Sequence, residues 1–395
     1  MTDMDIVIVN TQPVPSSGKG AASVNRILSY TKGLVKNGNN VRILSTAQSE
    51  DNNWWEYEGV PVKHLGGNTN GRIGHAFHFL KTAIRLISAL SKEKKDVVIF
   101  VTSNYSLIVL LEVYCKLTRT KIVNERSEYP FVLMSKNKLK RFFAPLYTHT
   151  AYKMLDGMIL MTRPLMEYYK PLVRKSCRFL EVPMTVDTQR FANQRGGGVN
   201  SCCPDDYVAY CGSMGGNKDG LHNLITIFSI VEQRGLPLSL LLIGGTNNKE
   251  EYDELISLNK RLGNKHVVFY GRAERDKMPS LLQGAMMLVL ARPSSLQSTG
   301  GFPTKLGEYL CTGNPVVVTA VGDIPHYLKD KENAYVVRPD DNEAFADAIC
   351  YVWEHREEAR KVGNNGQELA MTVFNGEYQA KRIEQYLKKL IEGKS

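Results

Sequence analysis

The chain has 395 residues, 43% of them hydrophobic and 23% charged, which predicts a globular protein of two domains, because single hydrophobic cores rarely grow to this length. No run approaches the about 20 apolar residues of a membrane span, and the first residues lack the features of a secretory signal, so we expect a cytoplasmic protein with its seven cysteines reduced. The net charge is +10, but residues 1–195 carry +13 (28 Lys and Arg against 15 Asp and Glu), whereas residues 196–395 carry −3 (22 against 25).

In the first half, short β-branched runs alternate with amphipathic helical patterns, as in doubly wound α/β folds. The expected strands are Ile6–Val9, Val41–Leu44, Val60–His64, Val97–Val101, Lys121–Asn124 and Gly157–Met161. The expected helices include Ala21–Lys36, Ile73–Ser91 and Lys138–Leu155. The alternation predicts a Rossmann-like domain over residues 1–195.

A glycine-containing loop follows the first expected strand. Gly18 and Gly20, with Lys19 between them, would let the backbone come close to a ligand. A dinucleotide-binding fingerprint is excluded, because the third glycine is replaced by Ser23 and the loop is long.

The second half repeats the alternation after residues 195–201, which we interpret as a hinge linker. The expected strands are Tyr207–Cys211, Leu238–Ile243, His266–Tyr270, Met286–Leu290, Pro315–Val318 and Ala334–Val337. The segment Gly376–Leu390 is helical by pattern. Two such sandwiches facing one another would place a ligand cleft where parallel strands end.

The most specific stretch runs from Gly300 to Val318 and predicts a loop, a helix and a buried strand. Pro303 is placed to start the helix and Gly313 to stop it. A helix N-terminus presents free N–H groups and a positive dipole end, which suit a diphosphate. Glu308 would lie just inside such a site, where its carboxylate could accept both hydroxyls of a ribose; the alternative is a solvated helix carboxylate.

This stretch resembles the family-4 retaining glycosyltransferases, which have the GT-B fold of two Rossmann-like domains facing across a cleft. In that family two Glu separated by seven residues precede a Gly-x-Pro-Val-Val strand. Here Glu308 is the second Glu and Gly313–Val317 is the strand, whereas the first Glu is replaced by Gly300. The resemblance implies sugar transfer from a UDP- or GDP-sugar, with donor contacts from Gly300, Gly301, Phe302, Pro303, Thr304, Lys305 and Glu308.

A second element of the same family lies after the strand Tyr207–Cys211. There the family has an Arg and a Lys that neutralise the donor diphosphate. Lys218 matches the Lys and is implied to stabilise the leaving group, whereas Ser213, beside Gly212, stands where the Arg would be. Arg272 lies at a strand end that resembles the wall of the family's nucleotide-base pocket.

The resemblance also assigns roles to the domains. Residues 1–195 would bind the acceptor, residues 196–375 the donor, and residues 376–395 would cross back to the first domain. Gly18, Lys19 and Gly20 would form the loop near the acceptor and the donor phosphates. Glu128, after the strand that ends at Asn124, is our candidate for a catalytic contact to the acceptor or sugar, although a structural role is as compatible with the sequence. No metal or further cofactor is implied.

Two other functions are compatible with these residues. A GT-B nucleotide-sugar epimerase would carry several catalytic acids and His residues in its cleft, and the sequence offers none in matching motifs. A non-catalytic sugar-nucleotide or lipid-binding relative is suggested by Gly300 and Ser213, which replace a Glu and an Arg of the family.

The charge asymmetry predicts an anionic partner for the first half. Its most basic segment, residues 136–143, combines four cations with two aromatic residues, as interfacial helices do. No aromatic platform of a nucleic-acid module is present. We therefore expect peripheral binding to the cytoplasmic membrane face and a glycan acceptor that is lipid-linked or a cell-surface polysaccharide precursor. The alternatives are a soluble acidic acceptor or charge that only aids solubility.

Overall fold

The computed structural model describes residues 3–15, 21–49, 51–66, 72–130, 142, 144–192, 203–204, 206–216, 218–246 and 248–393, with the backbone alone at 21 and 72–78. The chain forms two compact units. Unit 1 comprises Met1–Thr185 with Gly376–Ser395, and unit 2 comprises Val186–Asn375. The division at Val186 precedes the expected linker at 195–201, which lies outside the described residues.

Unit 1 contains an eight-stranded sheet in the order β3-β4-β2-β1-β5-β6-β7-β8. All neighbouring strands are parallel except β3 and β4. The strands are β1 (Asp5–Asn10), β2 (Asn40–Gln48), β3 (Trp54–Tyr57), β4 (Val60–Gly66), β5 (Val97–Val101), β6 (Lys121–Arg126), β7 (Gly157–Leu160) and β8 (Arg178–Glu181). The helices are α1 (Ala21–Lys36), α2 (Arg72–Lys92), α3 (Tyr105–Thr118), α5 (Ala144–Thr150), α6 (Arg163–Tyr169) and α16 (Gly376–Ile391). The six strands expected from β-branched runs are confirmed, and β3 and β8 are additional.

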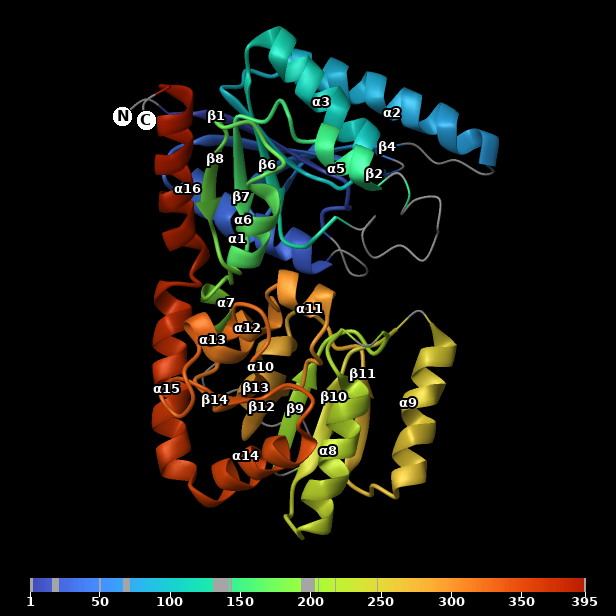
Figure 1. Cartoon of the computed structure of the whole chain (residues 1–395), viewed down its shortest axis with the longest axis vertical. Coiled ribbons are helices and arrows are strands. Elements are labelled where there is room, and N and C mark those ends of the chain that lie inside the picture. The colour runs from blue at the N-terminus through green and yellow to red at the C-terminus, as the bar shows by residue number, and fades with distance from the viewer. Residues whose placement is uncertain are drawn as a thin grey trace. The chain divides into compact units, whose positions relative to one another are not determined.

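The C-terminal helix α16 packs on α1 of unit 1, as the red and blue helices of Figure 1 show. The helices cross closely, because a Cβ added at Gly33 would lie 2.5 Å from Cβ of Ala380. Further along α16, the Tyr386 hydroxyl donates a hydrogen bond to the Arg178 carbonyl at 2.9 Å. Small residues at the crossing and a buried tyrosine therefore attach the end of the chain to unit 1.

A buried ion pair connects α1 to the sheet of unit 1. Nε of Arg26 lies 2.7 Å from Oε1 of Glu125, and both side chains are 1% exposed. The same guanidinium donates to the carbonyls of Val182 and Pro183. Losing either member of a buried pair leaves the other charge uncompensated. Glu125, at the end of β6, is therefore a structural residue.

Unit 2 contains a six-stranded parallel sheet in the order β11-β10-β9-β12-β13-β14. Its strands are β9 (Tyr207–Cys211), β10 (Ser239–Ile243), β11 (Val267–Gly271), β12 (Met287–Leu290), β13 (Val316–Thr319) and β14 (Tyr335–Val337). Its helices are α7 (Gln189–Ala192), α8 (Leu221–Gln233), α9 (Lys249–Leu262), α10 (Met278–Gln283), α11 (Leu296–Gly300), α12 (Lys305–Cys311), α13 (Ile324–Tyr327), α14 (Asn342–Glu354) and α15 (Arg356–Thr372). All six strands were expected. Both units are doubly wound α/β sandwiches, as the sequence predicted.

In unit 1, the carboxyl group of Glu112 is buried without a salt bridge to any residue that the structure describes and with few hydrogen bonds. Glu112 on α3 is fully buried, and its Oε1 accepts only a long hydrogen bond, 3.4 Å, from the Met154 amide. Its Oε2 has no hydrogen-bond partner among the described residues. Burial raises the pKa of Glu112 from 4.5 to about 7, although the Met154 amide and Arg174 lower it.

We predict that Glu112 makes the stability of unit 1 depend on pH. A carboxyl whose pKa is higher in the folded state binds its proton more readily there, so stability is highest below pH 4.5 and falls as the pH rises to about 7. The loss is about 3 kcal/mol at most. Glu112→Gln cannot ionise, so its thermal midpoint should fall less between pH 5 and pH 8 than that of the wild type. Glu357→Gln, at an exposed position of α15, is the control. Parallel pH profiles of wild type and Glu112→Gln would contradict this role.

Candidate functional site

The strand order of unit 2 reverses between β9 and β12, which are neighbours in the sheet. In open α/β sheets, ligands bind at the carboxyl ends of the strands beside such a reversal. The loops that leave β9 and β12 there are residues 212–220 and 291–295. This switch point is the first place to look for a site in unit 2.

Glycines allow the loops at the switch point to lie against one another. Gly244 follows β10 with a φ of +146°, and a Cβ there would collide with the Gly212 carbonyl. Gly220 ends the loop after β9 with a φ of +70°, and a Cβ there would collide with the carbonyl of Ala291. Only glycine fits this conformation and this approach together.

A lysine of α12 lies against the loop after β9. Nζ of Lys305 is 2.5 Å from Oδ2 of Asp219 and 3.1 Å from the Tyr210 hydroxyl. It also lies 4.5 Å from the centre of the Tyr210 ring, which adds a cation–π contact. A Cβ at Gly212 would collide with this ammonium group. Lys305 thus places a cation beside the loop in which Ser213 replaces the family's Arg.

Two further cations surround the same carboxylate. Nε of Arg292 lies 3.6 Å from Oδ1 of Asp219 and donates to the Lys218 carbonyl at 3.2 Å. Burial raises the pKa of Asp219, but Lys305, Arg292 and Lys218 outweigh burial and lower this pKa to about 2. Asp219 is therefore ionised near neutral pH. Three cations and one carboxylate leave two positive charges in excess, which suits an anionic ligand.

A hydrogen bond from the last residue of β9 to a buried tyrosine fixes the end of this strand next to the cations. The Tyr309 hydroxyl of α12 accepts a hydrogen bond from the Cys211 amide at 2.7 Å. Burial, followed by the charge of Glu308, raises the pKa of the Cys211 thiol to about 12. Cys211 is therefore a neutral packing residue and not a nucleophile.

Glu308 lies one turn along α12 from Lys305 and is paired with an arginine. Its Oε1 accepts a hydrogen bond at 2.8 Å from Nη1 of Arg190, on α7, and Nη2 of Arg190 donates to the Arg275 carbonyl at 3.2 Å. The other oxygen of Glu308, Oε2, accepts no hydrogen bond from the described residues. Arg190 thus fixes the carboxylate while one oxygen remains available for a hydroxyl group.

The segment before α12 lies partly in the core. Gly300 is buried at the end of α11, and Gly301 caps that helix. The Phe302 ring is 4% exposed and packs against Tyr327 and Phe374, each at 5.6 Å between ring centres. Its side chain is therefore an anchor of the loop, so any ligand contact of Phe302 must come from its backbone.

The helix that follows is shorter than its sequence pattern suggested. α12 has seven residues, and its N-cap Thr304 makes no side-chain cap hydrogen bond. Pro303 precedes this cap, and its carbonyl accepts from the Leu306 amide at 3.0 Å. The amides of Leu306 and Gly307 are already paired, because they donate to the carbonyls of Pro303 and Thr304 at 3.0 and 3.2 Å. With these first-turn amides occupied, the side-chain cations matter more here than the helix terminus.

The other predicted residues are distributed over both units. In unit 2, Ser213 and Arg272 are both exposed. The Arg272 side chain lies close to Gly245, because a Cβ added at Gly245 would be 2.8 Å from it. In unit 1, Glu128 is partly buried in the loop after β6, and its carbonyl accepts from Arg126 Nη2 at 3.3 Å.

The structure brings together only some of the predicted residues. Lys218, Lys305 and Glu308 meet around the switch point with Gly212. The predicted loop residues Gly18, Lys19 and Gly20, and most of the basic segment 136–143, lie outside the described residues.

Four residues of the site were not predicted as contacts. Asp219 and Tyr210 lie close in sequence to the predicted Lys218 and Gly212, whereas Arg292 follows β12 and Arg190 lies on α7. No local sequence pattern assigns a partner to any of these four residues. The signal that the sequence offered was a charged residue, Asp219, next to a glycine-rich loop.

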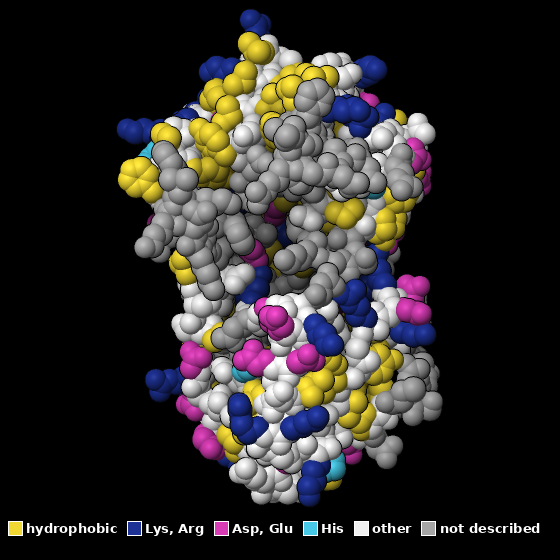
Figure 2. Space-filling view, turned by 90° about the vertical axis from the view of Figure 1, so that its right-hand side faces the viewer, with side chains coloured by type: hydrophobic (Ala, Val, Ile, Leu, Met, Phe, Trp, Pro, Cys, Tyr) yellow, Lys and Arg dark blue, Asp and Glu magenta, His cyan; other side chains and the backbone are white. Residues whose placement is uncertain are grey.

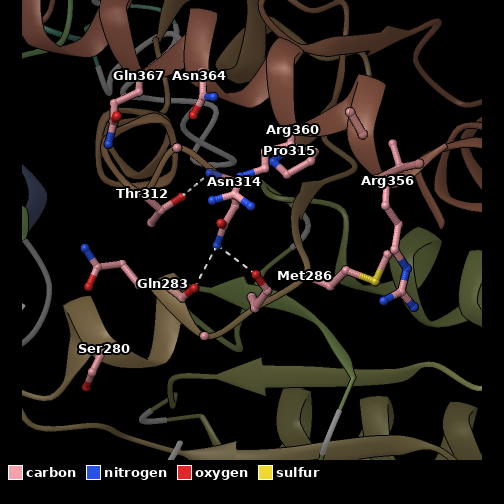
Figure 3. A pocket seen from close by; sticks show the side chains of 15 residues that line it. Ser280, Gln283, Met286, Thr312, Asn314, Pro315, Arg356, Arg360, Asn364 and Gln367 are labelled. Atoms are coloured by element: carbon pink, nitrogen blue, oxygen red, sulfur yellow. Dashed lines mark hydrogen bonds between the residues drawn. The ribbon is translucent and has the colours of Figure 1, made fainter. Parts of the chain in front are cut away.

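A cavity of about 620 Å³ lies at the opposite edge of the same sheet. Figure 3 shows Asn314 in its middle, with hydrogen bonds to the carbonyls of Gln283 and Ala285 at 3.1 and 2.7 Å. Gln367, also on its wall, donates to the Cys311 carbonyl at 2.7 Å. These amides pair the carbonyls that end α10 and α12. The polar side chains of this cavity therefore have a structural role, since they join α10 and α12 at the amino ends of β12 and β13.

Sequence comparison relates unit 2 to a known family. The family model described as "Glycosyl transferases group 1" matches residues 205–355. A curated relative, the D-rhamnosyltransferase WbpZ of Pseudomonas aeruginosa, is 30% identical over 122 residues. That match covers 31% of this chain and 31% of the relative, so it spans less than a third of the relative's length.

Structural comparison covers the whole chain. The sucrose-phosphate synthase of Thermosynechococcus elongatus has a TM-score of 0.76 at 18% identity, over 98% of this chain and 100% of that one. Anabaena HepE in complex with UDP has a TM-score of 0.71 at 14% identity, again over 98% and 100%. At such identities the likeness shows the fold alone. The predicted GT-B fold is therefore confirmed for the whole chain, and the resemblance to group 1 glycosyltransferases for residues 205–355.

The glycine that ends the loop after β9 gives a test of the site's construction. Gly220→Ala should be more destabilising than Gly216→Ala. Both positions have a φ near +70°, but a Cβ meets the Ala291 carbonyl at Gly220 and nothing within 4 Å at Gly216. We expect a loss of about 1 kcal/mol from the left-handed conformation in both variants, and a further loss of about 1–3 kcal/mol from the collision at Gly220. Equal losses in urea unfolding would show that the two loops do not pack as described.

Proposed function

We propose that this chain, whose residues 205–355 match the group 1 glycosyltransferases, transfers a sugar from a nucleoside-diphosphate sugar to a hydroxyl group of an acceptor. The observation that carries the proposal is the cationic cluster around Asp219, with the available oxygen of Glu308 on the same helix as Lys305. A diphosphate requires such cations, and the ribose joined to it requires an acceptor such as this carboxylate, one helical turn from Lys305.

The cations would bind and stabilise the diphosphate. Lys305 on α12 contacts Asp219, Lys218 lies beside Asp219 in the loop after β9 and lowers its pKa, and the buried Arg292 adds a third positive charge. Negative charge grows on the diphosphate as the bond to the sugar breaks. Fixed cations that are held in place before the reaction stabilise this charge at no cost of reorganisation. Lys218 and Lys305 are our candidates for stabilising the leaving group.

Glu308 would bind the ribose of the donor. Arg190 holds Oε1 of its carboxylate, so Oε2 can accept a ribose hydroxyl as a charge-assisted hydrogen bond. Arg190 acts here as a positioning residue, because it touches the carboxylate and not the donor. UDP and GDP share the ribose and the diphosphate, so these contacts serve either nucleotide.

The chemistry that we propose retains the anomeric configuration and needs no metal. An oxygen of the donor's own phosphate would take the proton from the acceptor hydroxyl as the new glycosidic bond forms. Among residues of unit 1, Glu128 is our candidate for orienting the acceptor or the sugar. The backbones of Gly300, Gly301 and Thr304 would line the donor sugar, where Gly300 replaces a glutamate of the family.

The acceptor that we propose is a lipid-linked glycan or a cell-surface polysaccharide precursor, met at the cytoplasmic face of a membrane. The support is the net +13 of residues 1–195, against −3 for residues 196–395. No helix among the described residues is long and apolar enough to span a bilayer. Attachment of such a chain to lipid would therefore be through a surface of unit 1.

Glu308→Gln tests the ribose contact. The variant keeps the shape of the side chain but loses the charge, so its affinity for UDP or GDP should fall by about 1.5–3 kcal/mol while the fold is retained. Isothermal titration with both nucleotides measures the change, and Glu250→Gln, at an exposed position of α9, is the control. Wild-type affinity in a folded Glu308→Gln variant would exclude Glu308 from the nucleotide site.

Chelation tests the source of the positive charge. Because Lys218, Lys305 and Arg292 supply the cations, release of nucleoside diphosphate from the donor should continue in EDTA at an unchanged rate. Chromatographic separation of UDP or GDP from the nucleotide sugar measures this reaction in EDTA, even without the acceptor, since water can replace it. Activity that disappears with EDTA and returns with manganese would contradict the metal-independent mechanism.

A further inference from the structure

Two neighbouring helices of unit 1 expose apolar side chains that nothing in the described structure covers. On α2, Phe79, Leu80 and Ile84 are 37%, 56% and 62% exposed, and on α3, Val113 and Leu117 are 43% and 79% exposed. Leu80 and Ile84, like Val113 and Leu117, are one turn apart and so share a helix face. Singly exposed apolar residues are ordinary, but pairs of them on adjacent helices form a patch.

The two helices are in direct contact with each other. The Ser91 hydroxyl of α2 lies 3.4 Å from the Tyr114 hydroxyl of α3, and the helices lie side by side in Figure 1. Their other faces are buried against unit 1 through Leu86 and Leu90 of α2 and Leu107 and Leu111 of α3. The exposed residues therefore lie on two helices that touch each other, and we call the solvent-facing sides of these helices together the α2–α3 face.

The same two helices carry exposed basic residues and no exposed acid. Lys81 and Lys92 on α2, and Lys116 and Arg119 at the end of α3, are exposed. The sequence of α2 contains no Asp or Glu, and the single acid of α3, Glu112, is buried. Figure 2 shows hydrophobic side chains with Lys and Arg, and few Asp or Glu, over the upper part of unit 1.

From these observations we propose that the α2–α3 face is the membrane-docking surface of the protein, and that it binds a bilayer containing anionic lipid. Apolar side chains enter the boundary between headgroups and acyl chains, while the surrounding cations pair with lipid phosphates. A protein partner would need a surface that is both apolar and strongly acidic, whereas an anionic bilayer presents both properties everywhere. This proposal rests on the proposed function, in which the acceptor is met at a membrane, and it names the surface that docks there. It uses none of the residues of the donor site in unit 2.

The expected behaviour has two separable parts. Each Lys or Arg near an anionic surface strengthens binding about fivefold, an effect that salt screens as the Debye length falls from about 10 Å at 0.1 M to about 3 Å at 1 M. The contribution of the apolar side chains to membrane binding does not depend on charge, so salt does not screen it. Binding should therefore require anionic lipid and weaken with salt, and it should also depend on Leu80, Ile84 and Leu117.

The test is flotation of the full chain with vesicles of phosphatidylcholine alone and of phosphatidylcholine mixed with phosphatidylglycerol. We expect binding to the mixed vesicles only. Replacing Lys81, Lys116 and Arg119 by Gln should lower the partition coefficient on the order of a hundredfold. Replacing Leu80, Ile84 and Leu117 by Ser should lower it by about tenfold or more.

Matched variants of unit 2 control for charge and apolarity as such. Gln at Lys249, Lys260 and Arg261, which are exposed on α9, removes as many cations, and Met371→Ser removes an apolar side chain that is 38% exposed. Both should bind vesicles like the wild type. Glu308→Gln should also float normally, and the α2–α3 variants should bind UDP or GDP normally. Failure of docking is thus distinguishable from failure of the donor site.

Three results would overturn the proposal. The first is no binding to the mixed vesicles at low salt. The second is unchanged binding in the Ser and Gln variants of the α2–α3 face. The third is that the wild type sediments as a dimer and the Ser variant as a monomer, because a second copy of the chain would then cover the face.

Discussion

The ionised carboxylate of Asp219 is the group on which the site of unit 2 depends. It is held between Lys305 of α12 and the buried Arg292 of the loop after β12, at 2.5 and 3.6 Å. Burying a carboxylate is costly unless opposite charges and hydrogen bonds compensate it, and these two cations do so. One side chain therefore fixes three segments at the switch point, and the cations are in place before any ligand arrives. Such preorganisation is what electrostatic stabilisation of a leaving group requires.

Much of the fold could be predicted from sequence, because each buried parallel strand leaves a short β-branched run. Every expected strand of unit 2 was found, whereas the missed strands, β3 and β8, are edge strands of four residues each. Lys218 and Glu308 could be located because they lie in local motifs. Their partners could not, since Glu308 and Arg190 are 118 residues apart and Lys305 and Asp219 are 86 apart. Only the folded sheet brings such pairs together.

The position of Lys305 explains how the chain can lack an arginine that the resemblance leads one to expect at position 213. Ser213 stands where the family has an arginine, and Lys305 of α12 fills the space beside Gly212 with a cation of its own. The two units also differ in the kind of surface that they present. Unit 2 holds a compact group of buried charges, to which we assign the donor chemistry, whereas unit 1 presents exposed apolar and basic side chains on α2 and α3. The proposed function, with a donor from solution and an acceptor at a membrane, would use both kinds of surface.

The function that we propose requires a nucleoside diphosphate to bind at the switch point between β9 and β12. Hydrogen–deuterium exchange with and without saturating UDP or GDP tests it most directly, because it reports where backbone amides become protected. We expect protection in residues 211–221 and 300–308, and none around the cavity that contains Asn314 and Arg360. Protection at that cavity with none in residues 211–221 would contradict the claim.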